Sequence, residues 1–392
     1  MRPEAIRDRV AIIGMGCTKF GENWDKSADD MIIEASFEAL EDGGVELKDI
    51  EAGWVGTVTT GGTGSLLSGP LKLPYLPVTR VENGCGTAME ALRNASFAVA
   101  CGLYDLVLVV GVEKLKDTGL GGLPEFMFHP VYGQGFTAPG RWALGATRYF
   151  QNYEIKPEEG KRLLAKIAVK NHHNGTLSPK AHFQREITLE QALAAPIVAW
   201  PLGLLDCCPV TDGAAAAVIC PIDIAKRFRD DYVLVKGFGV AMGPGLGKED
   251  IDYVYDRLPE TQAAAKQAYE MAGIEEPRKE ISLASLHDCF TIAELMEYEA
   301  VGFSPLGGAK QDIEAGTFTL EGELPVNTDG GLKSFGHPIG ATGLRMCYEA
   351  YKQFQGKADR RQLKDPKISF CMAQYGHPGF LGPVVTILGR RD

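Results

Sequence analysis

The chain has 392 residues, of which 45% are apolar and 23% are charged, and its formal net charge at pH 7 is -11. This length suffices for about two or three packed domains, and the composition is that of an ordinary soluble globular protein. Nucleic acid or an anionic membrane would require clustered Lys and Arg, so the acidic balance argues against both as the main partner. No apolar run approaches the roughly 20 residues that cross a bilayer. The charged N-terminus also lacks the apolar core of an export signal, so we expect a cytoplasmic protein.

Strands and helices alternate through the first part of the chain. The expected elements are strands at residues 9–15, 78–82 and 106–112 and helices at residues 27–42 and 87–100. Ser27, with Asp30 three residues later, is a capping box at the start of the first helix. Continuous apolar strands between helices predict a sheet that is covered on both faces.

The pattern loosens between residues 113 and 206 and becomes regular again at the apolar strand 213–220. A stretch of that length is rarely structureless, so we interpret it as an inserted loop or lid subdomain. The second half then repeats the order of the first. Its expected strands are residues 232–240, 281–286, 368–373 and 384–388, and its expected helices are residues 261–272, 292–301 and 341–354. We therefore predict an N-terminal half at residues 1–230, including the insertion at 113–206, and a C-terminal half at residues 231–392.

The nine cysteines are odd in number, scattered through apolar sequence, and include no C-x-x-C pair. This pattern is typical of reduced thiols rather than of a disulfide framework or a zinc site. Cys85 differs from the others because it lies between two glycines at the start of the helix 87–100. The unpaired N–H groups and the dipole of a helix N-terminus stabilise a thiolate, so we expect a lowered thiol pKa there. The alternative at this point is a buried structural cysteine.

A second group of candidate residues surrounds His337. The sequence from Asn327 to Gly343 is rich in glycine and places His337 between Gly336 and Pro338. Such an imidazole is poorly suited to core packing and well suited to accept the proton of a cysteine nucleophile. A phosphate loop is excluded because the pattern G-x-x-x-x-G-K-[ST] is missing. A structural turn remains the alternative.

The third candidate segment is His287-Asp-Cys289-Phe, directly after the strand 281–286. Polar residues at the C-terminal end of a strand in an α/β sheet lie where ligands usually bind. His287 could donate a hydrogen bond to a thioester oxygen, and Cys289 could carry a proton. A metal site is the less favoured interpretation, because the other thiols and imidazoles lack matching ligand spacing.

These segments together resemble the thiolase superfamily. VENGCGTAMEAL is similar to the segment with the acylated cysteine, NTDGG…GHPIGATG to the general-base loop, and CCPVTDGAAAAVI to the end of the N-terminal half. The HDCF sequence resembles the sterol-carrier-protein-type thiolases and the archaeal acetyl-CoA acetyltransferases. The resemblance covers nearly the whole chain. It implies a thiolase-like five-layer αβαβα fold built from two similar halves with an inserted loop subdomain.

The resemblance also implies the chemistry of an acetyl-CoA C-acyltransferase or acetyltransferase in fatty acid or ketone metabolism. Cys85 carries the acyl group during thiolysis of 3-ketoacyl-CoA or Claisen condensation of acetyl-CoA, and His337 is the base. His337 and His287 are candidates to stabilise the enolate oxygen. Asn327 and the backbone N–H of Gly379 are candidates for substrate or oxyanion binding. Coenzyme A is expected as a substrate, and no metal or permanent cofactor is expected.

One departure from the family leaves the second acid/base group open. Related biosynthetic enzymes have a C-terminal Cys-x-Gly, whereas this chain has Cys371 followed by Met and Ala373. The HDCF segment offers Cys289 for the same task, and we favour Cys289 over Cys371.

The resemblance leaves other functions and assemblies open. The acyl group on Cys85 could pass to a non-CoA acceptor, as in thiolase-like C-acyltransferases. The chain could also be an aldolase-like or partner-dependent subunit working with a small zinc-ribbon/OB-fold protein. At least a homodimer is expected, with acyl-CoA thioesters as the substrates.

Overall fold

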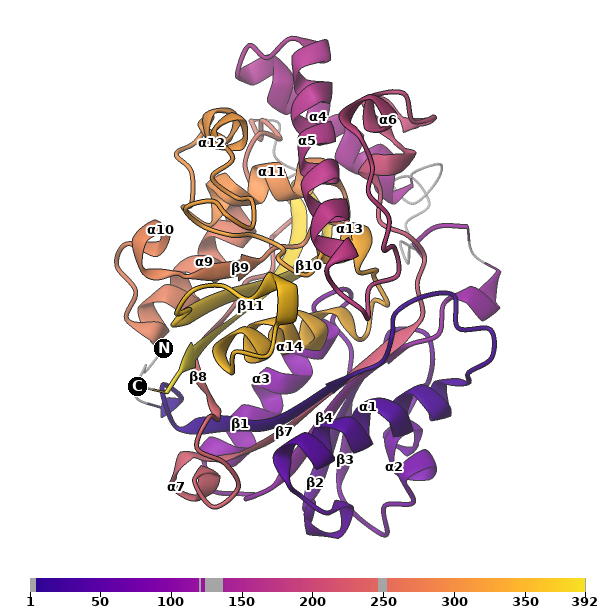
Figure 1. The fold of residues 1–392 in the computed structure, drawn as a ribbon, viewed down its shortest axis with the longest axis vertical. Coiled ribbons are helices and arrows are strands. Elements are labelled where there is room, and N and C mark those ends of the chain that lie inside the picture. Colours follow the sequence, from indigo (N-terminus) through magenta and orange to yellow (C-terminus); the bar gives the residue numbers. More distant parts are fainter. Residues whose placement is uncertain (1–4, 120, 124–136, 246–251, 392) are drawn as a thin grey trace.

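The computed structural model describes residues 5–119, 121–123, 137–245 and 252–391. A mixed sheet of nine strands runs through this described part of the chain in the order β3-β2-β4-β7-β1-β8-β11-β10-β9 (Figure 1). Its strands are β1 Val10–Cys17, β2 Ala52–Gly56, β3 Val78–Val81, β4 Val107–Glu113, β7 Gly213–Pro221, β8 Val233–Val240, β9 Leu283–Ser285, β10 Ile368–His377 and β11 Phe380–Arg390. The strands near its centre are almost fully buried, as their continuous apolar sequences predict.

The two halves of the sheet have the same topology. In the first half β1 pairs antiparallel with β7, β7 antiparallel with β4, and β4 parallel with β2. In the second half β8 pairs antiparallel with β11, β11 antiparallel with β10, and β10 parallel with β9. The halves join where β1 pairs with β8, at Ala11 opposite Leu234. The repeat that the order of elements indicated is therefore present in the strand pairing.

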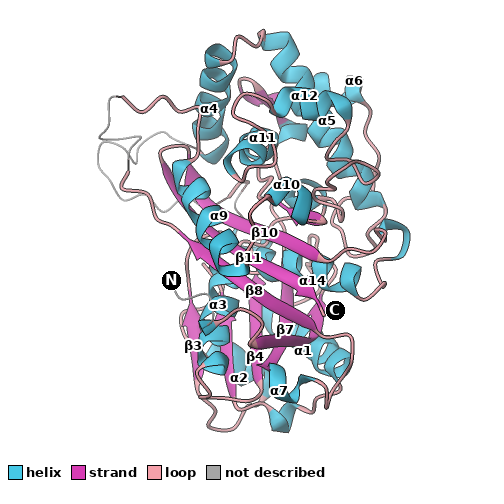
Figure 2. Cartoon of the chain, turned by 90° about the vertical axis from the view of Figure 1, so that its left-hand side faces the viewer, coloured by secondary structure: helices cyan, strands magenta, loops and turns pink. Residues whose placement is uncertain are grey.

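The two halves of the sheet form two of the layers, and helices form the other three. The helices of the described chain that cover or connect the sheet are α1 Ala28–Gly43, α2 Ser65–Leu71, α3 Thr87–Ala100, α7 Ile222–Ala225, α9 Pro259–Ala272, α10 Pro277–Glu280 and α14 Thr342–Phe354. On the outer faces, α1 packs on the first half of the sheet and α9 on the second (Figure 2). Between the halves, α3 and α14 contact each other and strands of both halves. This arrangement is the predicted five-layer αβαβα fold.

Local sequence explains how α1 packs so closely. The Ser27 side chain accepts a hydrogen bond from the Asp30 backbone N–H at 3.2 Å, and the Asp30 carboxylate accepts from Ser27, so the predicted capping box is confirmed. A Cβ atom at Gly14 in β1 would lie 2.1 Å from the backbone oxygen of Ala39. Because only glycine avoids this overlap, Gly14 allows the helix to rest directly on the strand.

The upper part of Figure 1 contains helices from both halves of the sequence. The insertion contributes α4 Ala138–Asn152, α5 Pro157–Thr176, α6 Leu189–Leu193 and the short strands β5 Ile197–Ala199 and β6 Leu202–Gly203. The C-terminal half contributes α11 Thr291–Ala300, α12 Ala309–Ala315 and α13 Gly331–Ser334. Residues 124–136 of the insertion lie outside the described residues. The limits predicted for the two halves and for the insertion stay predictions.

The main difference from the expected elements is the length of β10 and β11. Both strands extend several residues beyond the predicted 368–373 and 384–388, because residues 374–377 and 380–383 also pair, as far as His377 opposite Phe380. Among the described helices, none is both long and apolar enough to cross a membrane.

Candidate active site

The Cys85 segment is a tight turn between β3 and α3. Gly84 adopts a φ of 52°, and a Cβ atom there would lie 2.5 Å from the Cβ of Tyr375 in β10. The Thr87 hydroxyl closes the turn, since it accepts from the Asn83 N–H at 2.8 Å and donates to the Gly84 carbonyl at 2.6 Å. The turn therefore needs glycine at position 84, and it holds Cys85 against the β10–β11 hairpin.

His337 meets Cys85 from the other half of the molecule. It is fully buried just before α14, and its Nε2 atom lies 3.3 Å from the Cys85 Sγ atom. Its Nδ1 atom lies 2.7 Å from the Thr342 hydroxyl, which itself donates to the Pro338 carbonyl at 3.0 Å. Since the hydroxyl has one proton, it must accept from His337 Nδ1–H. Nε2 of the neutral imidazole is then unprotonated and faces the thiol, as a general base requires.

The electrostatic environment keeps both groups neutral. Burial raises the pKa of the Cys85 thiol to about 12, and the Glu113 carboxylate adds to this effect. Burial also lowers the pKa of His337 well below its usual value, as do His287 and Arg345. The expectation of a lowered thiol pKa at the helix N-terminus was wrong, because desolvation of the thiolate outweighs the helix dipole. These two shifts favour a thiol and a neutral imidazole base over a preformed ion pair.

His287 lies beside this pair. It follows β9, is 1% exposed, and its ring centroid is 5.1 Å from that of His337 in an edge-to-face arrangement. Burial lowers the pKa of His287 to about 3, and its Nδ1 atom has no hydrogen-bond partner among the described residues. The backbone N–H of His287 donates to Glu297 at 2.8 Å, which fixes its position. The His287 ring is therefore neutral and keeps one nitrogen without a partner among the described residues.

One atom of each of Cys85, His287 and His337 lies within 4.8 Å of the other two, a spacing that could also suit a metal ion. The Cys85–His337 hydrogen bond accounts for two of these atoms without a metal. The expectation of a metal-free site stays a prediction.

The structure separates the two cysteines considered as second acid/base groups. Cys289 is buried, and burial raises its thiol pKa well above the usual value, with Cys208 and Cys85 as further causes. The Cys371 Sγ atom donates instead to the Met346 carbonyl of α14 at 3.6 Å. The preference for Cys289 over Cys371 stays a prediction.

Asn327 and Gly379 have other contacts in this structure. The Asn327 side chain accepts from the Leu286 N–H at 2.9 Å and donates to Glu294 at 3.1 Å, so it ties its loop to the end of β9. Gly379 lies in the turn between β10 and β11, and its backbone lies near the Tyr253 hydroxyl. Their roles in substrate or oxyanion binding stay predictions.

Sequence reasoning missed two buried carboxylates that hold the site together. Asp288 accepts the backbone N–H groups of Leu332 at 2.6 Å and Lys333 at 3.0 Å, which fastens the HDCF segment to α13. Glu113 accepts from the loop at residues 57–60 and from the Gly340 N–H at 3.1 Å, which fastens the His337 loop to β4. The signal for Asp288 was its place inside the HDCF motif. For Glu113 it was an acidic residue at the end of a buried apolar strand.

Comparisons with known proteins identify the family. Residues 10–223 match the model of the thiolase N-terminal domain, and residues 248–390 match the model described as thiolase C-terminal domain-like. The chain belongs to the thiolase family. Acetyl-CoA acetyltransferase of Methanothermobacter thermautotrophicus is 38% identical over 93% of this chain and 95% of that protein. Sterol carrier protein 2 of Gallus gallus is 33% identical over 92% of this chain and 69% of that protein. The predicted resemblance to both groups of thiolases is therefore confirmed.

A solved structure gives a further comparison for this thiolase-family chain. The structure titled Ltp2-ChsH2(DUF35) aldolase is 26% identical, with a TM-score of 0.84 over 98% of this chain and 99% of that one. That structure therefore has a similar fold over almost the whole of this chain.

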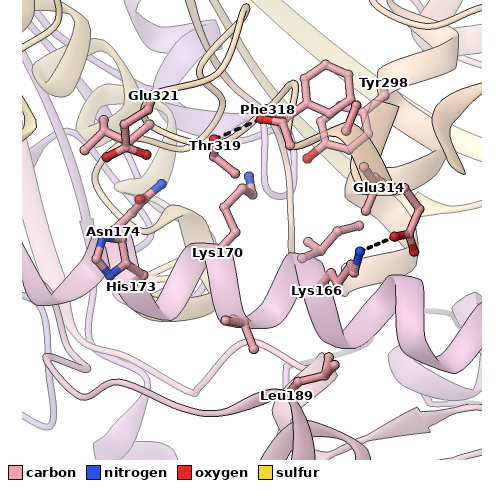
Figure 3. Close-up of a pocket in the computed structure, with 16 residues that line it drawn as sticks. Lys166, Lys170, His173, Asn174, Leu189, Tyr298, Glu314, Phe318, Thr319 and Glu321 are labelled. Atoms are coloured by element: carbon pink, nitrogen blue, oxygen red, sulfur yellow. Dashed lines mark hydrogen bonds and ion pairs between the residues drawn. The ribbon is translucent and has the colours of Figure 1, made fainter. Parts of the chain in front are cut away.

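A cavity of about 470 Å³ lies between α5 and the segment 313–321 (Figure 3). Lys166, Lys170 and His173 of α5 line one wall, and the segment 313–321 lines the other. Its inner wall includes Tyr298, whose ring stacks on Phe318 at 3.7 Å. None of the predicted site residues of this thiolase-family chain lines the cavity, so it is not the acyl-transfer site.

Proposed function

We propose that the protein is a CoA-dependent acyltransferase that cleaves 3-ketoacyl-CoA by thiolysis, or forms it by Claisen condensation, through an acyl-Cys85 intermediate. The observation that carries this proposal is the relay from Cys85 Sγ through the His337 imidazole to Thr342. Membership of the thiolase family and the names of its acetyltransferase relatives support it.

In the first half-reaction, His337 Nε2 takes the thiol proton as Cys85 Sγ attacks the 3-keto carbon. The Cα–Cβ bond then breaks, and the acyl group stays on sulfur as a thioester. The enolate of acetyl-CoA takes a proton from Cys289 and leaves as acetyl-CoA. His287 and His337 donate hydrogen bonds to the oxygens that become negative, where preorganised donors act most strongly.

In the second half-reaction, the Cys289 thiolate takes the proton of free CoA. The CoA sulfur attacks the acyl carbonyl, and the Cys85–acyl bond breaks. Cys85 recovers its proton from His337, so both residues return to their starting states. The high thiol pKa supports this cycle, because a thiolate that is unstable in the buried site is a reactive nucleophile and needs the adjacent base.

A thiolysis assay tests the proposal. The wild-type protein should convert acetoacetyl-CoA and CoA into two molecules of acetyl-CoA, and Cys85→Ala should not. Turnover that survives in Cys85→Ala would exclude the acyl-Cys85 route.

A second candidate is a catalytic subunit that needs a small partner protein. The solved Ltp2-ChsH2(DUF35) aldolase, whose title names two components, favours it. Light scattering on protein isolated from its source organism tests this. A homodimer alone would favour the plain acyltransferase, whereas a stoichiometric small subunit would favour the complex. The proposal of a plain acyltransferase has four further parts. It includes a homodimer, a cytoplasmic location, a role in fatty acid or ketone metabolism, and the lack of a permanent cofactor.

A further inference from the structure

Lys333 is a buried lysine without an anionic partner. It lies in α13, four residues before His337, and is 1% exposed. Two other lysines among the described residues are buried, and each has an anionic partner. Lys114 forms an ion pair with Asp212, and Lys161 forms one with Asp206. Within the described chain, no carboxylate lies within 4.0 Å of the Lys333 ammonium, and no hydrogen bond reaches it. Its contact is the ring of Phe183, whose centroid is 5.9 Å from Nζ.

The two carboxylates whose charges act on this ammonium, Asp288 and Asp206, hold other donors. Asp288 accepts from the Leu332 and Lys333 backbone and from the Asn171 side chain, the last at 2.8 Å. Asp206 is paired with Lys161 and also accepts from Thr291 at 2.9 Å and from the Gly203 N–H at 2.7 Å. Both carboxylates already have other hydrogen-bond donors or an ion-pair partner, so neither is paired with the charge of Lys333.

The side chain of Lys333 lies next to the reaction site. The segment at Phe183 runs along α13, since its N–H donates to the Ser334 carbonyl at 2.9 Å. The Lys333 charge acts on the thiols of Cys207 and Cys208, lowering the pKa of each against the larger effect of burial. Cys208 in turn donates its N–H to the Cys289 carbonyl at 2.9 Å. The ammonium is therefore close enough to Cys207 and Cys208 to act on their thiols, and Cys208 is hydrogen-bonded to Cys289.

We propose that Lys333 is a specificity-determining residue that binds a carboxylate at the far end of the acyl group. This inference rests on the proposed acyl-CoA function and adds a substrate class, 3-ketoacyl thioesters that carry a second acidic group. An unpaired buried ammonium destabilises the free protein, and an anion that enters the site relieves this cost. One ammonium matches the single charge of a carboxylate, whereas the multiply charged phosphates of CoA favour a hydrated surface.

Specificity kinetics test the proposal. The substrates are 3-ketoadipyl-CoA and its methyl ester, which differ only in the terminal charge. For the wild-type protein we expect kcat/KM to favour the free acid by roughly 10- to 100-fold, the size of one charge-assisted hydrogen bond. Lys333→Met should bring this ratio close to one. The control is Lys352→Met, because Lys352 lies 5.2 Å over the Tyr348 ring on α14 in a comparable cation–π contact. It should keep the wild-type ratio.

A binding measurement separates this inference from the proposed function. Adipyl-CoA lacks the 3-keto group and cannot undergo Cα–Cβ cleavage, and in a Cys85→Ala background it cannot acylate the nucleophile either. Calorimetry in that background, which has no thiolase activity, can therefore compare its Kd with that of its methyl ester. Tighter binding of the free acid, lost in Lys333→Met, would support the inference whatever the turnover. Equal affinities for acid and ester in the Cys85→Ala protein would overturn it. It would also be overturned if Lys333→Met weakened both ligands and free CoA by one common factor, since Lys333 would then contact the CoA part.

Discussion

The Nε2 atom of His337 lies 3.3 Å from the Sγ atom of Cys85, although 252 residues separate them in the sequence. Cys85 precedes α3 and His337 precedes α14, and these two helices pack together between the halves of the sheet. The pair therefore depends on the repeat: each half supplies one helix N-terminus, and their packing brings the nucleophile to its base.

The Thr342 hydroxyl fixes the tautomer of His337. Thr342→Val keeps the shape of the side chain but removes the acceptor of Nδ1–H, so Nε2 no longer presents its lone pair reliably to the thiol. We expect kcat/KM for thiolysis of acetoacetyl-CoA to fall by roughly 10- to 100-fold, as is usual when the group that orients a functional histidine is removed. Thr342→Ser retains a hydroxyl and should stay close to the wild type. Equal activities of the Val and Ser variants would contradict the role given to this hydrogen bond.

The thiol pKa predicts how Cys85 reacts with alkylating agents. Burial raises this pKa to about 12, so the thiolate fraction in the free protein stays small and rises about tenfold with each pH unit below that value. His337 stays neutral over the same range because burial lowers its pKa. The rate of Cys85 alkylation by iodoacetamide, followed by intact mass, should keep rising from pH 6 to pH 9. A plateau that begins near pH 6 would instead indicate a thiolate–imidazolium pair.

Asp288 holds the HDCF segment on α13. Asp288→Ala leaves the N–H groups of Leu332 and Lys333 and the amide of Asn171 without this acceptor. We expect the free energy of unfolding to fall by about 2–4 kcal/mol, because buried donors lose their partner. We also expect kcat to fall more than KM rises, because His287 and His337 lose their fixed spacing. Asp288→Asn keeps one acceptor oxygen and should lie between the two. Urea unfolding and steady-state kinetics measure both effects, and an Ala variant with wild-type stability would contradict this account.

The unpaired charge of Lys333 predicts a pH-dependent stability difference. Burial lowers the pKa of Lys333, so the unfolded chain binds this proton more tightly and the charged lysine destabilises the fold. Lys333→Met should therefore raise the free energy of unfolding near pH 7 by about 1–4 kcal/mol. The gain should shrink as pH rises towards about 10.4, the pKa of an unfolded lysine. Urea unfolding at pH 7 and pH 10 checks the sign. A gain that grew with pH would show that the charge is not the cause.

Much of the fold could be predicted from the sequence because its elements carry strong local signals. The strands β1, β4 and β7 are continuous apolar runs, α3 begins at the residue expected, and Ser27 and Asp30 form the cap that their spacing indicates. The paired extensions of β10 and β11 were missed because neither is a continuous apolar run: residues 374–377 are mostly polar or glycine, and Gly382 and Pro383 interrupt residues 380–383. Their order comes from partners in the neighbouring strand, which local periodicity does not show.

Part of the site could also be predicted, because some of its residues carry strong local signals. Cys85, His287 and His337 stand in unusual glycine-rich or strand-end contexts, and the structure brings them together. The direction of the Cys85 pKa shift was predicted wrongly. The helix N-terminus, which lowers the pKa, is visible in the local sequence, whereas the burial that raises it comes from the other half of the chain. Thr342, Glu113 and Lys333 were missed because their roles follow from long-range contacts rather than from spacing.

The most direct test of the account is the mass of the protein after mixing with acetyl-CoA or acetoacetyl-CoA. We predict the addition of one acetyl group to the wild-type chain, its location on Cys85 by peptide mapping, its release on addition of free CoA, and its loss in Cys85→Ser. If no short-chain CoA ester acylates the wild-type chain, or if the acetyl group is found on another residue, the proposed acyl-Cys85 mechanism is contradicted.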